Sequence, residues 1–102
     1  MSLTPKQTRH LRGLAHHLEP IMRIGGDRVT DGVIGHIEEL LEAREFIKVR
    51  MLDAEKDEVA EARAEIVART QAEVVQTIGH TLVLYRRRRD RNKPPAVTLP
   101  RG

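Results

Sequence analysis

The first apolar pattern along the chain is that of a capped helix. Thr4, Pro5 and Gln7 have the spacing of a capping box with proline at the first helical position. An apolar stripe follows at helical spacing, made of Leu3, Leu11, Leu14, Ala15 and Leu18. We expect this helix to end before Pro20, because proline disfavours the helical conformation of the residue that precedes it.

A short apolar run and a second helical stripe come next. Residues 21–24 predict a strand, and residues 31–43 predict a helix with Thr30 as its N-cap. The apolar positions of this helix are Val33, Ile34, Ile37, Leu40 and Leu41, and its outer positions are Glu38, Glu39 and Glu42. The acidic positions indicate a solvated face.

The second half of the chain contains one more helix between strands. Residues 45–51 alternate between apolar and polar positions, which predicts a half-buried strand. Residues 56–70 predict a third helix. Residues 72–78 and 81–85 are β-branched runs separated by Gly79-His80, which predicts a hairpin with a type II′ turn.

The predicted order of elements is α-β-α-β-α-β-β, which indicates one compact α/β (α+β) domain with a four-stranded mixed sheet. Right-handed crossovers between the first three strands would place the Gly25-Gly26 loop at the C-terminal end of a strand. Open sheets usually bind their ligands at that end.

Composition limits the classes of protein that fit this pattern. The 102 residues suffice for one domain, and the absence of cysteine excludes disulfides and thiolate metal sites. The sequence has no apolar run of the length of a signal peptide or membrane span, and we expect a soluble cytoplasmic protein. Phe46 and Tyr85 are the two aromatic residues, so base stacking on aromatic side chains is not the main binding device.

Charge is distributed unevenly along the chain. Residues 1–28 carry five Lys or Arg against two acids, residues 29–85 carry six against twelve, and residues 86–102 carry seven against one. The net charge of +3 therefore combines basic ends with an acidic middle. This distribution favours an oriented contact with a polyanion.

The segment Gly25-Gly26-Asp27-Arg28 is the main candidate site. Two adjacent glycines let backbone N–H groups approach a phosphate, and Arg28 adds a permanent cation. The first turn of the following helix would direct unpaired N–H groups at an anion bound there. A plain tight turn is the alternative interpretation of the same residues.

Two other basic groups are candidates for contact with a polyanion. Lys6, Arg9 and Arg12 share one side of the first helix, and a run of four arginines follows the last strand: Arg86, Arg87, Arg88 and Arg89. Clustered arginine is typical of nucleic-acid-binding surfaces, and a merely solvated end is the alternative. We expect the chain to loosen at Pro94-Pro95.

The sequence does not favour catalysis or metal binding. The chain has five histidines: His10, His16, His17, His36 and His80. No carboxylate stands at the spacing of a familiar metal-ligand set with them, so we predict no metal site and no cofactor. We expect His16 to be a partly buried packing residue. The sequence also lacks a P-loop, a Gly-x-Ser-x-Gly motif and a thiol, so we expect that the protein is not an enzyme.

A series of motifs in fixed order resembles the CRM domain (YhbY-like) family. The matching segments are Leu11-Arg12-Gly13-Leu14-Ala15-His16, Pro20, Ile24-Gly25 with Thr30 and Gly32-Val33, Glu45-Phe46-Ile47-Lys48-Val49, Ile78-Gly79 and Thr81-Leu82-Val83-Leu84-Tyr85-Arg86. The resemblance implies a fold similar to the C-terminal domain of translation initiation factor three. It also implies binding to structured RNA, and for bacterial single-domain members association with the precursor of the large ribosomal subunit.

The sequence departs from the family pattern in two places. The family usually carries Gly-x-x-Gly, and Arg28 stands here at the position of the second glycine. If that position needs a positive φ, either Arg28 adopts it at a cost in strain or the neighbouring Gly26 shifts the turn by one residue. His80 occupies a hairpin position where the family often has Lys or Arg, which makes the charge there depend on pH.

We therefore expect a CRM-type RNA-binding domain over residues 1–86 and a basic, proline-containing tail over residues 87–102. The expected partner is ribosomal RNA in the precursor of the large subunit, bound by a monomer with no small-molecule substrate. Two alternatives are a protein-interaction module that uses the acidic helices and a DNA-binding regulator. The second is disfavoured because no helix has the Arg and Asn/Gln arrangement of a recognition helix.

Overall fold

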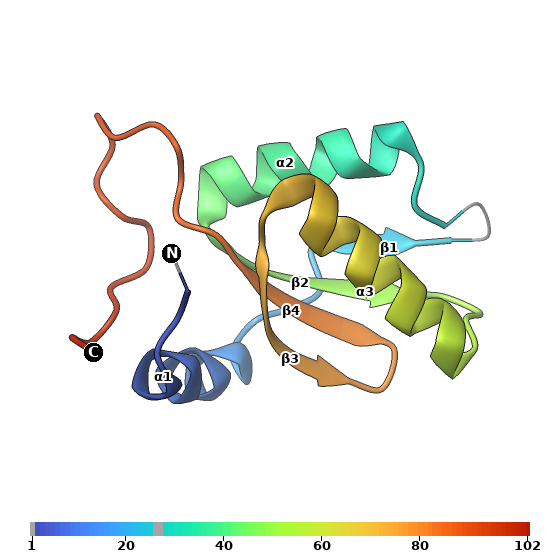
Figure 1. Cartoon of the computed structure of the whole chain (residues 1–102), viewed down its shortest axis with the longest axis horizontal. Helices are drawn as coiled ribbons and strands as arrows, with labels where there is room; N and C mark the ends of the chain where they lie inside the picture. The colour runs from blue at the N-terminus through green and yellow to red at the C-terminus, as the bar shows by residue number, and fades with distance from the viewer. Residues whose placement is uncertain (1, 26–27) are drawn as a thin grey trace.

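The structure, a computed structural model, describes residues 2–25 and 28–102. Its elements in chain order are α1 (Pro5–Ala15), β1 (Met22–Ile24), α2 (Asp31–Arg44), β2 (Phe46–Met51), α3 (Lys56–Thr70), β3 (Glu73–Ile78) and β4 (Thr81–Tyr85) (Figure 1). The predicted α-β-α-β-α-β-β order and the α+β class with a four-stranded mixed sheet are confirmed.

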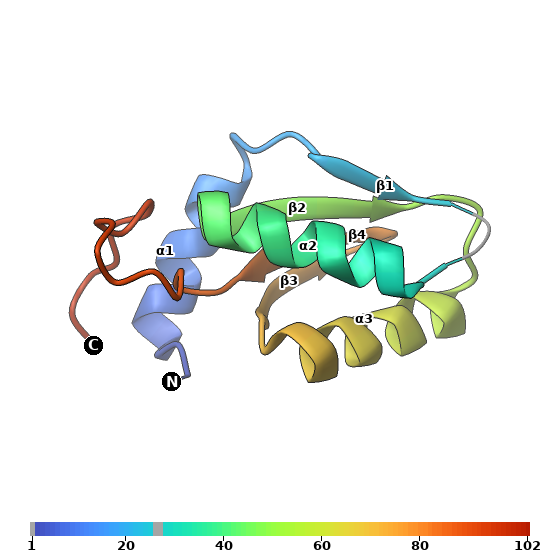
Figure 2. The ribbon, with the colours of Figure 1, turned by 90° about the horizontal axis from the view of Figure 1, so that it is seen from above.

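The four strands form one sheet in the order β1-β2-β4-β3 (Figure 2). β1 pairs in parallel with β2, whereas β4 is antiparallel to both β2 and β3. β1, β2 and β3 therefore point the same way, and the segments that follow them gather at one end of the sheet (Figures 1 and 2). We call this end, formed by Gly25, Arg28, residues 52–55 and the Gly79-His80 turn, the loop end.

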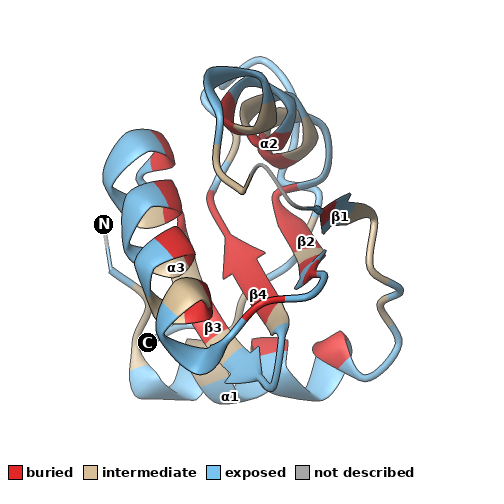
Figure 3. Cartoon of the chain, turned by 90° about the vertical axis from the view of Figure 1, so that its right-hand side faces the viewer, coloured by how far each residue is buried: buried red, intermediate tan, exposed pale blue. Residues whose placement is uncertain are grey.

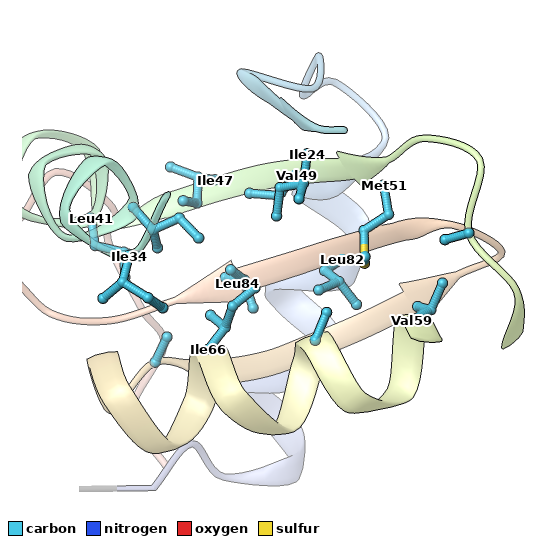
Figure 4. Packing of buried hydrophobic residues seen from close by; sticks show 14 residues of the cluster. Ile24, Ile34, Leu41, Ile47, Val49, Met51, Val59, Ile66, Leu82 and Leu84 are labelled. Atoms are coloured by element: carbon cyan, nitrogen blue, oxygen red, sulfur yellow. The ribbon is translucent and has the colours of Figure 1, made fainter. Parts of the chain in front are cut away.

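Helices cover both faces of the sheet (Figure 3). α2 and α3 lie over one face, where the larger core includes Ile34, Leu41 and Ile66 (Figure 4). α1 lies over the other face, above a smaller core that includes Leu11 and Phe46. The prediction that residues 45–51 form a half-buried strand is therefore wrong at its start, since α1 covers Phe46 and leaves it 6% exposed.

Local sequence signals explain where the elements begin and turn. The Thr4 side chain accepts a hydrogen bond from the Gln7 N–H and the Gln7 side chain accepts one from the Thr4 N–H, which completes the predicted capping box of α1. The Thr30 hydroxyl accepts from the Val33 N–H at the start of α2. Gly79 has a φ of +57°, the left-handed value that the first central residue of a type II′ turn requires.

The C-terminal segment, residues 86–102, packs onto the body of the protein. Val97 and Leu99 lie against the core beneath α1, and both chain termini lie on the same side of the molecule (Figures 1 and 2). The buried Glu45 carboxylate accepts hydrogen bonds from the N–H groups of Ala96 and Val97 at 2.7 and 3.1 Å. The expectation that the chain loosens at Pro94-Pro95 is wrong, because the Glu45 carboxylate binds the backbone N–H groups of the two residues that follow these prolines.

Candidate nucleic-acid interface

The candidate loop joins β1 to α2 at the loop end. Gly25 is exposed and follows the last residue of β1, whose carbonyl accepts from the Leu52 N–H at 2.9 Å. Gly26 and Asp27, two of the four predicted loop residues, lie outside the described residues. The loop leads into the N-terminus of α2, a helix of 14 residues whose first N–H groups carry partial positive charge.

Arg28 braces this loop with its side chain. It has a φ of +60°, the left-handed value that the family's second glycine would adopt at less cost. Its guanidinium donates to the carbonyl oxygens of Gly25, Leu52 and Asp53 at 3.1, 2.8 and 2.6 Å, and its Nε lies 3.2 Å from a Glu58 carboxylate oxygen. Arg28 therefore ties the loop to the segment between β2 and α3, and these bonds offset the backbone strain.

The Glu58 carboxylate is part of the same contact. The backbone N–H of Glu55 first, and the Arg28 guanidinium second, lower the pKa of Glu58 below its ordinary value. Glu58 thus remains charged at neutral pH and fixes the direction of the Arg28 side chain.

Among the described residues, no side chain or backbone atom crowds the position that a Gly25 side chain would take. Gly25 does not have a positive φ, and a Cβ added to it would meet no described atom within 4 Å beyond its chain neighbours. A larger residue is therefore compatible with the folded chain here. The described residues therefore give no packing reason for glycine here, and close approach of another molecule to the backbone is one that fits.

The basic residues of α1 are exposed. Lys6 and Arg9 lie on the solvent side, and Arg12 is exposed while its Nε donates to the Val75 carbonyl of β3 at 3.0 Å. The C-terminal segment runs beside this helix, since the Gln7 amide donates to the Pro100 carbonyl. His16 is exposed, so its expected role as a partly buried packing residue is wrong.

Arg86 is a structural residue in this fold. Its side chain is 8% exposed, and its guanidinium donates to a Glu38 carboxylate oxygen at 2.7 Å and to the Thr70 carbonyl at 2.9 Å. A Glu42 oxygen lies 3.5 Å from the same group. We therefore leave Arg86 out of the proposed interface, and two of the predicted solvated glutamates of α2 prove to be its partners.

The remaining arginines of the predicted run differ in exposure. Arg88 is half-buried and donates to the Ala43 carbonyl at 3.0 Å. Arg89 is exposed and donates to the Gln71 side chain at 2.8 Å. Arg87 is exposed and, among the described residues, its side chain makes no hydrogen bond or ion pair. Contact of these residues with RNA stays a prediction.

The basic elements predicted together lie at two ends of the molecule. The glycine loop is at the loop end, whereas Arg87, Arg88 and Arg89 follow β4 at the opposite end, beside the chain termini (Figures 1 and 2). One compact contact cannot include both groups, so a ligand that touches both has to extend along the molecule.

Sequence reasoning missed two arginines near the loop. Arg23 of β1 and Arg50 of β2 are exposed and stand directly opposite each other in the parallel register. The alternation of residues 45–51 already placed Arg50 on the outward side, but the pairing with Arg23 depends on strand order and register, which periodicity alone does not give.

No helix in the described part of the chain is long and apolar enough to cross a membrane. Within the same residues, no three His, Asp or Glu side chains gather in a way that would hold a metal ion.

Comparison with known proteins places this architecture in a family. Residues 3–86 match the family model of the CRS1 / YhbY (CRM) domain. A Haemophilus influenzae protein named "RNA-binding protein" is 46% identical over 85 residues, which cover 83% of this chain and 86% of the relative. The Bacillus subtilis "Probable RNA-binding protein YqeI" is 46% identical over 101 residues, covering 96% of this chain and 99% of the relative.

A solved structure shows the same fold. The solution structure of the Staphylococcus aureus protein SAV1595 superposes with a TM-score of 0.78 at 39% identity, covering 97% of this chain and 100% of the other. The chain therefore belongs to the CRS1/YhbY (CRM) domain family, which confirms the resemblance seen in the sequence.

Proposed function

We propose that this protein is a non-enzymatic RNA-binding protein that docks on ribosomal RNA during assembly of the large ribosomal subunit. The observation that carries this proposal is the match of residues 3–86 to an RNA-binding family together with the position of the loop. The loop follows β1 at the end of the sheet where open sheets bind ligands, and it leads into the N-terminus of α2. Backbone N–H groups there suit a phosphate.

Within this proposal the loop of residues 25–28 binds a turn of the RNA backbone. Gly25 gives the RNA close access to the main chain, because no side chain stands in the way. Arg28 holds the loop in position through its carbonyl contacts and brings one positive charge near the bound phosphate. The main role of Arg28 is therefore to hold the conformation of the loop.

The basic residues of α1 supply a second contact. Lys6, Arg9 and Arg12 are exposed and lie outside the ion-pair network of the described residues. Their contacts with phosphates would position the protein on RNA without reading its sequence. At the opposite end, Arg87 and Arg89 would reach a more distant part of a large RNA.

Gly25→Val tests the loop. A branched side chain at Gly25 should weaken binding to a structured fragment of large-subunit ribosomal RNA at least tenfold, while the melting temperature stays near that of the parent, because the fold leaves space for it. Gly35→Val is the matched control, since Gly35 is exposed on α2 and also has open space around it. Equal affinity of the Gly25 variant and the control would assign the loop a purely structural role.

The class of partner is tested by measuring affinity at several salt concentrations for three ligands. These are the ribosomal RNA fragment, a random RNA of equal length and duplex DNA. Preference for the ribosomal fragment supports the proposal, and preference for duplex DNA supports a DNA-binding regulator. Absence of salt-sensitive nucleic-acid binding would favour a protein-interaction module that uses the acidic helices.

The assembly role needs a separate experiment. The tagged protein should co-sediment with precursors of the large subunit in preference to mature subunits. Crosslinks from the loop should map to one region of the ribosomal RNA. Sedimentation with free protein alone would overturn the assembly role and leave RNA binding intact.

A further inference from the structure

α1 covers only part of its face of the sheet. At the C-terminal end of the helix, the Lys48 ammonium donates to the carbonyl of Ala15, the last residue of α1, at 2.8 Å. Arg50 lies two residues further along β2, on the same face and about 7 Å beyond that contact. β2 therefore extends past the end of α1, and its last outward-facing position is left open to solvent.

Arg50 belongs to one row of residues across all four strands, of which Arg23, Arg50 and Ile78 are exposed and Thr81 is half-buried. The register places Arg23 of β1 opposite Arg50 of β2, Arg50 opposite Thr81 of β4, and Thr81 opposite Ile78 of β3. Directly opposite residues point to the same face of a sheet, and neighbouring strands lie about 4.8 Å apart, so the row spans roughly 14 Å. We call this row of four residues the open strip.

The chemistry of the open strip is unusual for a solvated sheet face. Arg23 and Arg50 are like charges directly opposite each other, an arrangement that destabilises a sheet. Ile78, at the far side of the strip, is 48% exposed. Two adjacent cations, with an apolar side chain two strands beyond Arg50, would complement a phosphate backbone and a sugar or base of the same RNA.

The open strip also continues the glycine loop. Arg23 is the middle residue of β1 and lies two residues before Gly25, which follows the strand, so an RNA strand bound at the loop lies close to the open strip. We propose that the open strip is an RNA-backbone binding surface, in which Arg23 and Arg50 bind consecutive phosphates of the strand that leaves the loop. This inference rests on the proposed RNA-binding function and names a part of the interface beyond the loop, α1 and the C-terminal arginines.

The test compares two double variants of equal charge change. Arg23→Gln with Arg50→Gln removes the proposed contacts, and Arg44→Gln with Arg69→Gln removes two exposed arginines of α2 and α3, the helices over the other face of the sheet. Each phosphate contact contributes about 0.7–0.9 to the slope of log affinity against log salt. The first variant should therefore lower that slope by about 1.4–1.8 and weaken binding to the ribosomal RNA fragment about 25–60-fold at 0.1 M salt. The control should change affinity less than about threefold, since distant exposed charges are screened.

Stability gives an independent readout. Removing the opposed like charges should leave the melting temperature unchanged or raise it, so the expected loss of binding is not a loss of fold. Titration of the ¹⁵N-labelled parent with RNA should also move the Nε–Hε signals of Arg23 and Arg50. This measurement tests the strip on the parent protein whatever the variants do.

The possible results separate this inference from the function on which it rests. If the parent binds RNA while the two double variants have the same affinity and salt slope, the open strip is not a binding surface and RNA binding stands. The same conclusion follows if loop amides shift on RNA addition and the two arginine side chains do not. If the parent binds no RNA, both the function and the strip are overturned.

Discussion

Glu45 is the residue whose replacement tests the structure most directly. Its side chain is fully buried, and its carboxylate accepts three backbone hydrogen bonds: from Arg88 at one oxygen (2.8 Å), and from Ala96 and Val97 at the other (2.7 and 3.1 Å). These bonds hold the C-terminal segment against the body. We predict that Glu45→Gln weakens this attachment because the amide keeps one acceptor and turns the other into a donor.

The size of the effect follows from the number of bonds changed. A hydrogen bond to a charged acceptor contributes about 1.5–3 kcal/mol. In Glu45→Gln the amide oxygen can keep the Ala96 and Val97 bonds, now to a neutral acceptor, while the NH₂ group faces the Arg88 N–H, so the Arg88 bond is lost and two donors face each other. We expect the free energy of unfolding to fall by about 2–3 kcal/mol, or the melting temperature by about 10–20 °C.

Thermal unfolding and amide hydrogen exchange measure the two consequences. The amides of Ala96 and Val97 should lose protection before the amides of β4 do, because the segment detaches before the sheet opens. Glu39→Gln is the matched control, since Glu39 is exposed on the preceding helix. A melting temperature within 2 °C of the parent, with protection of both amides retained, would refute the role of the carboxylate as an anchor.

Three further predictions concern other contacts. Arg86→Met should destabilise the fold by about 1.5–3 kcal/mol in urea unfolding, because it removes the 2.7 Å hydrogen bond to the Glu38 carboxylate and leaves that carboxylate only the longer contact with Arg89; an effect under 1 kcal/mol would contradict this. Glu58 has a lowered pKa, so its charge stabilises the fold above its ordinary pKa of 4.5, and this contribution is lost as the pH falls through the lowered pKa. The melting temperature of Glu58→Gln should therefore depend less on pH between about pH 3 and 6 than that of the parent, and an unchanged dependence would contradict the pairing. Gly79→Ala should lower the free energy of unfolding by about 1–2 kcal/mol because Gly79 has a positive φ, whereas Gly13→Ala, on the exposed side of α1, should raise it by about 0.5–1 kcal/mol. Equal effects of the two variants in urea unfolding would refute the turn assignment.

The elements of this fold were predictable because their signals are local. The Thr4 capping box, the apolar periodicity of residues 31–43 and the Gly79-His80 turn each act within a few residues, and each appears in the structure as predicted. The buried state of Phe46 was not predictable in this way. It depends on α1 reaching the second face of the sheet, a packing choice that alternation within one strand does not contain.

The candidate site shows the same division more sharply. The sequence by itself determined that basic residues concentrate at the chain ends and that a glycine loop with Arg28 follows the first strand. Only the tertiary structure decided what those charges do: the Arg28 guanidinium binds carbonyls of a loop 24 and 25 residues away, and Arg86 is buried against α2. The sequence of an arginine run is the same whether the folded chain places carboxylates or water beside it. Ion pairing and cross-strand register, as between Arg23 and Arg50, depend on distances through space between residues far apart in the chain, and the chain acquires those distances only when it folds.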